Sequence, residues 1–234
     1  MEAAVEIASG RALGVGRYTV PAAARLIAAH QNKVRSWVNG YPESDAEPII
    51  QRDLPDANGR ALLSFLDLVE TAFVRHFRMI GYTPQTIRKV ANKLRQRYEV
   101  QHPFAMDTRF RADGKQIFEE TVSEDGERKL LNLMNDNFEM RPVVEGSLFR
   151  RIFYVDDVAR RWTPVAEIRT VVVDPTIAFG KPVVLPFGIP TATLARDVEI
   201  FGSVNEVSEE YDVPTSSVQQ ALKFEQILSN RLLH

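Results

Sequence analysis

The last third of the chain alternates short apolar runs with prolines, and this pattern restricts the possible folds more than any other feature. Residues 170–175 read Thr-Val-Val-Val-Asp-Pro, and further prolines follow at positions 182, 186 and 190. Proline has no amide hydrogen to donate to a sheet, so it is confined to edge strands, strand starts and loops. The sequence therefore predicts a strand over 169–173, followed by an ordered loop or an edge strand.

A helix-turn-helix pattern follows this segment. Thr191 can cap a helix that runs to Ile200, and Gly202 separates it from a second helix over 204–211. Turn residues at 212–215 lead into a third helix over 216–228. The side of this helix expected to face outward comprises Ser216, Ser217, Gln219, Gln220 and Lys223. The stretch 197–212 holds six acids and no lysine or arginine, so this unit is poorly suited to binding phosphates.

Residues 18–41 show a second helix-turn-helix pattern. Thr19 is a suitable N-cap, and Pro21 is tolerated in the first turn of a helix that ends near Ala28. After a turn at 29–31, a second helix is expected to end at Asn39-Gly40. Its apolar residues recur at helical spacing and predict an inward face; they are Val34, Trp37 and Val38.

The outward side of this second helix is suited to nucleic acid. Arginine can bond guanine through two hydrogen bonds, asparagine can bond adenine in the same way, and lysine can pair with phosphate. The candidate DNA-binding residues are Arg17, Asn32, Lys33, Arg35 and Ser36. The alternative is a basic helix face that is merely solvated.

The net charge of −2 conceals a segregation of the charged residues. Residues 11–41 contain five lysines and arginines and no acid, and residues 71–98 contain seven and no acid. A phosphate backbone would be attracted to both blocks. On the second block the basic residues expected outside the helix are Arg88, Lys89, Lys93, Arg95 and Arg97. They form either a phosphate-contacting surface or a solubilising face.

From Gly59 the sequence predicts a long helix that Gly81 ends, before Thr83 and Pro84 start another. The apolar residues between 62 and 77 lie on more than one face of the first helix. Such a helix is either deeply buried or packed against a second copy of itself. Because operator-binding proteins commonly use two-fold symmetry, we expect a homodimer.

The middle of the chain predicts an antiparallel meander. Asp113-Gly114 and Asp125-Gly126 are hairpin signals, and strands are expected near 108–112, 115–122, 127–133, 140–145 and 150–155. Residues 156–163 are expected to form a turn and a short helix, with a domain boundary near Thr163. The adjacent acids Asp156 and Asp157 have no third ligand at a suitable spacing, so we expect no metal site there.

Several classes of protein are disfavoured by what the sequence does not contain. There is no cysteine, hence no disulfide, thiolate metal site or cysteine nucleophile. No stretch matches a membrane span or a signal peptide, and we expect a cytoplasmic protein. The four histidines are poorly placed for catalysis, and no phosphate-binding loop or nucleophile elbow is present. We therefore expect a binding protein without enzymatic activity, cofactor or metal.

Several motifs resemble one family. Val173-Asp174-Pro175, the Ala-Phe-Gly-Lys-Pro-Val run at 178–183, Ile189-Pro190-Thr191 and residues 202–211 resemble the C-terminal domain of VapB-type antitoxins. Residues 18–26 with Val34-Arg35 and Trp37 are similar to a MerR-like helix-turn-helix. Residues 63–77, 86–89 and 102–105 resemble larger antitoxins that combine both units. The chain departs from the family at 186–188, where Pro-Phe-Gly replaces the usual Gly-Thr-Arg before Ile-Pro.

The sequence patterns and the resemblance together predict an α+β fold with an N-terminal MerR-like helix-turn-helix and long helices, a central antiparallel β meander and a C-terminal helical helix-turn-helix domain. The expected divisions are a flexible tail at 1–15, the MerR-like unit and dimerisation helices at 16–105, the β region at 106–165 and the antitoxin domain at 166–234.

The resemblance also implies a function. A bacterial antitoxin of this kind binds and blocks a PIN-like ribonuclease toxin and represses the operon that both share. The family's DNA contacts carry over to Lys33 and Arg35. The toxin is expected to dock on 166–234, with Lys223 or Arg231 as a cation that could displace metal from the nuclease site. The alternative for these two residues is a surface role alone. The alternative is a stand-alone helix-turn-helix transcriptional regulator whose C-terminal unit oligomerises or binds an effector.

Overall fold

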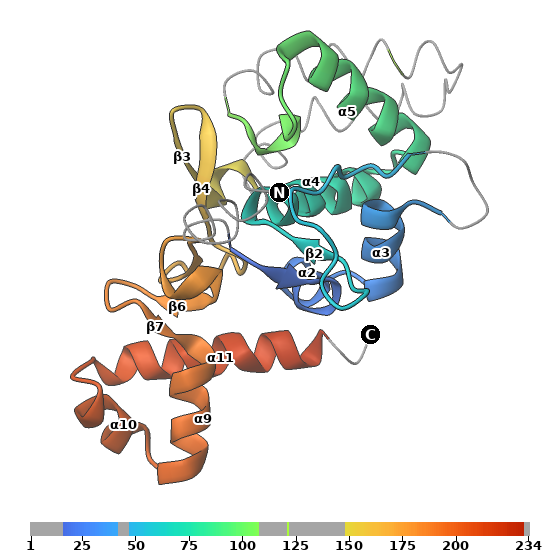
Figure 1. Cartoon of the computed structure of the whole chain (residues 1–234). Helices are drawn as coiled ribbons and strands as arrows, with labels where there is room; N and C mark the ends of the chain where they lie inside the picture. The colour runs from blue at the N-terminus through green and yellow to red at the C-terminus, as the bar shows by residue number, and fades with distance from the viewer. Residues whose placement is uncertain (1–15, 42–46, 108–120, 122–147, 232–234) are drawn as a thin grey trace, which may run out of the picture.

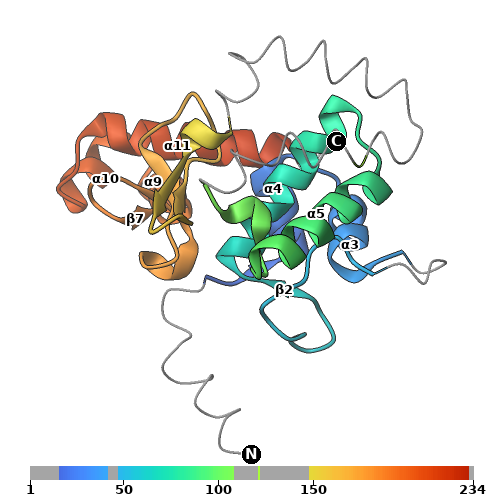
Figure 2. The same ribbon diagram turned by 90° about the horizontal axis from the view of Figure 1, so that it is seen from above.

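The computed structural model describes residues 16–41, 47–107, 121 and 148–231. Within these ranges the chain forms seven α-helices and two antiparallel sheets, which confirms the expected α+β class. The helices of the first hundred residues lie together, and the larger sheet leads from their side into the C-terminal helices (Figure 1). Seen from above, α9–α11 lie on one side and α3–α5 on the other (Figure 2). No helix in the described ranges is long and apolar enough to cross a membrane.

The N-terminal unit contains the two consecutive helices that the sequence predicts. Strand β1 (Tyr18–Thr19) leads into α2 (Val20–Ile27), and α3 (Gln31–Asn39) follows after a short turn. The Thr19 hydroxyl accepts a hydrogen bond from the Ala22 amide, which confirms its role as N-cap. The inward residues of α3 are buried as expected; they are Val34, Trp37 and Val38.

The long helix begins later than the sequence predicts. Residues 62 and 63 form strand β2 (Leu62–Leu63), which pairs antiparallel with β1, and α4 (Phe65–Ile80) starts only after Ser64. Ser64 and Asp67 form a capping box, in which the Ser64 hydroxyl accepts from the Asp67 amide and the Asp67 carboxylate accepts from the Ser64 amide. Pairing with β1 is a long-range contact that helical periodicity does not report. Helix α5 (Pro84–Tyr98) follows Gly81 as expected.

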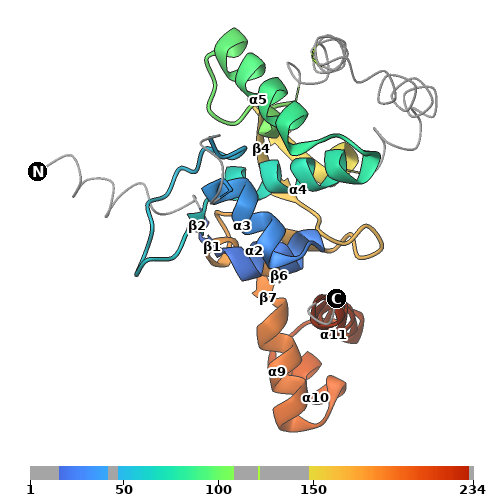
Figure 3. The ribbon, with the colours of Figure 1, turned by 90° about the vertical axis from the view of Figure 1, so that its right-hand side faces the viewer.

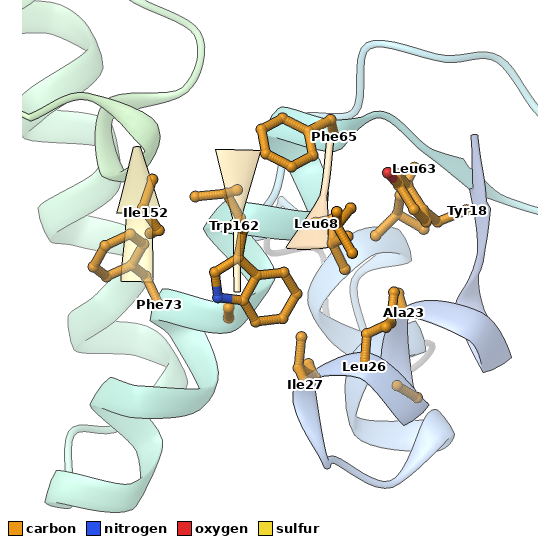
Figure 4. Packing of buried hydrophobic residues seen from close by; sticks show 14 of the residues in the cluster. Tyr18, Ala23, Leu26, Ile27, Leu63, Phe65, Leu68, Phe73, Ile152 and Trp162 are labelled. Atoms are coloured by element: carbon orange, nitrogen blue, oxygen red, sulfur yellow. The ribbon is translucent and has the colours of Figure 1, made fainter. Parts of the chain in front are cut away.

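The apolar surface of α4 is covered within the chain. The helix packs against α2, the turn Pro103–Ala105 and strand β4 (Val158–Trp162). Phe73 and Val74 are fully buried. The rings of Phe77 and Phe104 pack edge to face, with their centroids 5.2 Å apart. Figure 4 shows Phe73 and Leu68 on either side of Trp162. The apolar surface of α4, on which the expected homodimer depends, is therefore covered by other parts of the same chain.

The larger sheet has five strands in sequential order: β3 (Ile152–Val155), β4, β5 (Val171–Val173), β6 (Pro182–Val184) and β7 (Ile189–Pro190). The short helix expected after Asp157 is wrong, because 158–162 is strand β4, joined to β3 through left-handed Asp156 and Asp157. Trp162 pairs with Val173, so the boundary expected at 165/166 falls inside this sheet. Thr121, in the strand expected over 115–122, is helical. The other residues of the strands expected between 108 and 145, and the tail at 1–15, lie outside the described residues.

The C-terminal helices occur where they are expected. They are α9 (Thr191–Phe201), α10 (Val204–Glu210) and α11 (Thr215–Asn230), and α9 and α10 extend away from the rest of the chain (Figure 3). Thr191 is the first helical residue rather than the N-cap, which is Pro190. The Thr191 hydroxyl instead donates to the Glu225 carboxylate at 2.5 Å and ties α9 to α11.

A buried tyrosine joins the two halves of the chain. The Tyr18 hydroxyl donates to the carbonyl oxygen of Gly180 at 2.8 Å, and burial raises the pKa of Tyr18. Gly180 has a φ of +81°, and a Cβ atom there would lie 2.2 Å from the Tyr18 oxygen. The contact therefore requires glycine for both its backbone conformation and its lack of a side chain.

We expect Gly180→Ala to lower the free energy of unfolding by about 2–4 kcal/mol, through left-handed strain and overpacking together. Gly202→Ala is the matched control, because Gly202 has a φ of +77° and no atom within 4 Å of the added Cβ. It should cost only about 1 kcal/mol. Urea unfolding measures both values. In a Tyr18→Phe background the excess cost of Gly180→Ala should shrink, and equal costs for the two glycines would contradict the steric argument.

A second buried contact joins the loop 47–58 to α4. His102 Nε2 lies 2.8 Å from Asp53 Oδ1, and its Nδ1 lies 3.4 Å from Glu70 Oε2. Burial alone would lower the pKa of His102, but its hydrogen bonds to Asp53 and Glu70 outweigh burial and raise the pKa to about 10. Burial also raises the pKa of Asp67 to about 6. The Oδ1 atom of Asp67 lies 3.8 Å from His102 Nδ1. Arg95 Nη2 faces Glu70 at 3.7 Å.

This cluster predicts a loss of stability at high pH. Because the folded pKa of His102 is above its ordinary value of 6.5, its contribution is complete below that pH and is lost as the pH rises through about 10. His102→Gln should lower the free energy of unfolding by roughly 3 kcal/mol at pH 7, because it leaves two carboxylates facing a neutral group. At pH 10 the decrease should be much smaller. Urea unfolding at both values checks this. His30→Asn, which replaces the exposed histidine that caps α3, is the control for the loss of a histidine.

Candidate nucleic-acid interface

The turn between α2 and α3 is fixed from both sides. Ala28 ends α2 in the left-handed conformation with a φ of 55°, and its amide donates back to Ala24 and Arg25. His30 is the N-cap of α3, and its Nδ1 accepts from the Asn32 amide at 3.2 Å. From α4, Arg75 Nε donates to the Ala28 carbonyl at 2.8 Å. The orientation of α3 is therefore set by backbone capping and by a side chain of a distant helix.

Helix α3 presents four of the five residues predicted to bind DNA. Asn32, Lys33 and Arg35 are exposed, and Ser36 is half-buried. The Ser36 hydroxyl donates to the Asn32 carbonyl at 2.9 Å, and Arg35 Nη1 lies at the limit of hydrogen bonding to Asn32 Oδ1, at 3.5 Å. Of the four side chains, Lys33 and Arg35 are best placed to reach a phosphate or a base edge.

Arg17 lies apart from this face. It is exposed on the strand side of α2 and lines a cavity of about 540 Å³ that no residue of α3 lines. The walls of this cavity come from α2, α11 and the segment 179–182, and include Phe179, Lys181 and Leu228. The structure therefore does not bring Arg17 together with Lys33 and Arg35.

A basic cleft that the sequence did not predict adjoins α3. It has a volume of about 430 Å³ and is lined by His30 and Lys33 from the α3 side and by Arg75, Arg78 and Met79 from the end of α4. None of the described residues that line it is acidic. The only sequence signal was that Arg75 and Arg78 belong to an acid-free block. Their position beside α3 depends on how α4 packs, which the sequence pattern does not show.

The second basic block is less exposed than expected. Arg95 points inward, where its Nη2 donates to the Ile49 carbonyl at 2.8 Å and faces Glu70. Lys89 and Arg97 of the same helix are exposed, and Arg88 and Lys93 are half-buried. The expected outer face of α5 therefore lacks Arg95, which instead holds the loop before α4.

The expected outward face of α11 is also smaller. Ser217 is buried, and Gln220 accepts a hydrogen bond from the Thr170 hydroxyl, which leaves Ser216, Gln219 and Lys223 exposed. Arg231 is not an exposed cation, because its Nη1 donates to the carbonyls of Arg25 and Leu26 at 3.1 and 2.8 Å. These two arginine bonds join the end of α11 to the end of α2.

One group of described residues has the spacing of metal ligands. Asp53, Asp67 and His102 each offer an atom within 4.8 Å of the others. Both imidazole nitrogens of His102 already face carboxylates, at 2.8 and 3.4 Å. A proton on His102 therefore supplies the positive charge between them, and we interpret this group as an ion-pair network that holds the loop.

The chain is similar to a solved structure and to a protein of described function. The crystal structure of Rv2018 from Mycobacterium tuberculosis matches with a TM-score of 0.69 at 22% identity, over 88% of this chain and 96% of that one, which shows a shared fold. By sequence, a protein of the same organism described as "Putative antitoxin VapB45" is 24% identical over 223 residues. That alignment covers 88% of this chain and 92% of the relative. No family model matches the chain.

The geometry of α3 predicts different effects for its two main cations. Arg35→Ala should cost about 1–3 kcal/mol of binding to duplex DNA from upstream of its own gene and alter sequence preference, if Arg35 reads a base. Lys33→Ala should weaken all sequences alike and reduce the salt dependence. Lys223→Ala, which removes an exposed lysine of α11, is the control. Fluorescence anisotropy at several salt concentrations measures these effects. If DNA affinity is unchanged in the Lys33/Arg35 double variant, α3 does not contact the DNA.

Proposed function

We propose that this protein is an antitoxin that neutralises a PIN-like ribonuclease toxin and represses the operon of both proteins. The similarity to the VapB45 relative over most of both chains supports the first part. The observation that carries the second part is the exposed basic face of α3 beside a cleft lined by Lys33, Arg75 and Arg78. In this proposal the protein acts by binding rather than by catalysis.

The two helix-turn-helix units have opposite charge, and we assign them different partners. The α3 side attracts phosphates, whereas α10 carries Glu206, Glu209 and Glu210 around a hollow that also includes Phe201. Ile200 and Phe201 are 67% and 49% exposed at the end of α9. An exposed apolar pair with charged surroundings is typical of a protein-binding surface. We assign the toxin to this C-terminal unit.

Among the cations proposed to contact the toxin, Lys223 and Arg231 differ in their surroundings. Lys223 is exposed on α11 and is free to meet an acidic nuclease site. Arg231 is half-buried and bonded to α2, so its role in this proposal is to hold the two units together. We also propose that a homodimer represses the operon, because operator sites commonly have two-fold symmetry.

A stand-alone transcriptional regulator is the second candidate function. The 540 Å³ cavity between β1, α2 and α11 favours it, because its volume lies in the range of small-molecule sites. An effector bound beside Arg17 and Lys181 would contact both halves of the chain. A regulator of this kind would need no toxin gene nearby.

Co-expression with the product of the adjacent gene tests the antitoxin proposal. We expect a complex that co-purifies and a nuclease that is inactive within it. Phe201→Asp and Lys223→Glu should each lower affinity at least about tenfold without changing the unfolding temperature, since both side chains are exposed. Lys33→Ala should leave the complex intact. Failure of the wild-type protein to bind any neighbouring gene product would favour the stand-alone regulator.

Arg231→Ala should behave differently from Lys223→Glu. It removes hydrogen bonds to two backbone carbonyls, so we expect the free energy of unfolding to fall by about 1–3 kcal/mol. This decrease should occur with or without bound toxin. Thermal unfolding of the isolated protein measures this. A stable Arg231→Ala protein that fails to bind toxin would instead make Arg231 a direct toxin contact.

A further inference from the structure

The cavity of about 540 Å³ beside Arg17 lies where the two halves of the chain meet. Helix α11 passes α2 and β6 at this junction (Figure 1). Most of the wall is apolar, and its apolar side chains include Ala22, Leu26, Phe179, Pro182, Ala192 and Leu228. Sites for small molecules typically have such a volume and such a wall, and they occur preferentially where two units of a fold meet. The junction therefore has room for a small organic molecule.

The charged groups of the wall are mainly cations. Among the described residues that line the cavity, Arg17, Arg25 and Lys181 are cations and Glu225 is an acid. The Glu225 carboxylate accepts a hydrogen bond from the Thr191 hydroxyl at 2.5 Å. It forms no ion pair with the three cations within the described part of the chain. The wall therefore favours an anionic ligand.

Arg25 of α2 lacks an acceptor for its guanidinium group. The residue is half-buried, and its Nε atom is buried without a hydrogen-bond partner. Within the described ranges its side chain takes part in no ion pair. Arginine stays protonated in proteins, and an unmet buried donor is uncommon in folded structures. A ligand carboxylate would supply the missing acceptor, because guanidinium and carboxylate groups form strong charge-assisted hydrogen bonds.

The turn Ala178–Gly180 places a strained aromatic residue at the edge of the cavity. Phe179 has a φ of 58°, a left-handed conformation that is costly for a residue with a side chain. Its ring is 72% exposed although it lines the cavity. Strained residues of this kind cluster at sites that clamp ligands. An exposed ring beside an apolar wall also offers a stacking surface to another aromatic ring.

We propose that this cavity binds a small organic acid with an aromatic body and one carboxylate. The apolar wall and the Phe179 ring cover the body, and Arg25 binds the carboxylate. Arg17 and Lys181, which are exposed, add positive charge around the site. A sugar or a polyphosphate would instead bury many polar groups against apolar side chains, which is unfavourable.

The proposed ligand site extends the second candidate function, in which this cavity holds an effector. It requires neither a toxin nor DNA. A bound acid would contact α2 and α11 together, and it would therefore add an attachment between the two halves of the chain.

Titration calorimetry and thermal unfolding of the full chain test this proposal, with 3-phenylpropionate as the probe. The matched compounds are 3-phenylpropan-1-ol, which has the same body without the charge, and acetate, which has the charge without the body. We expect saturable binding of 3-phenylpropionate at one site per chain and a rise in unfolding temperature, since a ligand that binds only the folded state stabilises it. The alcohol and acetate should each bind at least tenfold more weakly.

Two variants with matched controls locate the site. Arg25→Gln should weaken binding of the acid at least tenfold and leave binding of the alcohol unchanged. Arg169→Gln makes the same change in charge at an exposed arginine outside the cavity and should have no effect. Ala192→Trp fills the cavity from an exposed position on α9 and should abolish binding. Ala166→Trp, at an exposed position that does not line the cavity, should not.

Phe179→Gly separates the ring of Phe179 from its backbone strain. Glycine adopts the left-handed conformation readily, so the unfolding temperature should not fall. Loss of the ring should nevertheless weaken binding of the acid severalfold.

The proposal is overturned if the wild-type protein does not bind 3-phenylpropionate or binds the alcohol as tightly. It is also overturned if Arg25→Gln, Ala192→Trp or Phe179→Gly binds the acid as the wild type does. All of these measurements use the protein alone. A negative result therefore leaves the antitoxin proposal standing, because that proposal is tested by co-purification with the product of the adjacent gene.

Discussion

Helix α2 ends against the body of the protein, and its last carbonyl groups depend on arginines from distant parts of the chain. Arg75 reaches Ala28 from α4, and Arg231 reaches Arg25 and Leu26 from beyond α11. Cations near a helix C-terminus also interact favourably with its dipole. Because α3 follows α2 after a three-residue turn, these bonds set the direction of the face that carries Lys33 and Arg35.

The same helix is held at its start by the contact between Tyr18 and Gly180. Together these bonds attach both ends of α2 to the C-terminal half, through the segment before β6 at one end and the residue after α11 at the other. The sheet adds a third connection, because β4 and β5 pair across the boundary expected at 165/166. The N-terminal and C-terminal helices are therefore parts of one structure, although their charges differ in sign.

Local signals in the sequence predicted the elements well, and long-range contacts account for most of the errors. Thr19 and Thr83 cap their helices as expected, and the buried stripe of α3 follows from its periodicity. Residues 62–63 and 158–162 were assigned to helices because nothing local shows the partner strands that they pair with. The α3 face was predictable for the same local reason, whereas Arg75 and Arg78 join it only through the packing of α4. Arg95 and Arg231 look like surface cations in sequence and are both bonded to backbone carbonyls.

The position of Arg231 also orders events during protein synthesis. A ribosome makes the residues of α2 and α3 early, but the side chain that bonds the end of α2 is added more than two hundred residues after Arg25. Until then the nascent N-terminal unit lacks that cap, the Gly180 carbonyl and the strands β5–β7. The bonds that fix the end of α2, and with it the direction of α3, therefore form only after the C-terminal helices have been translated, and a chain that stops early would lack them.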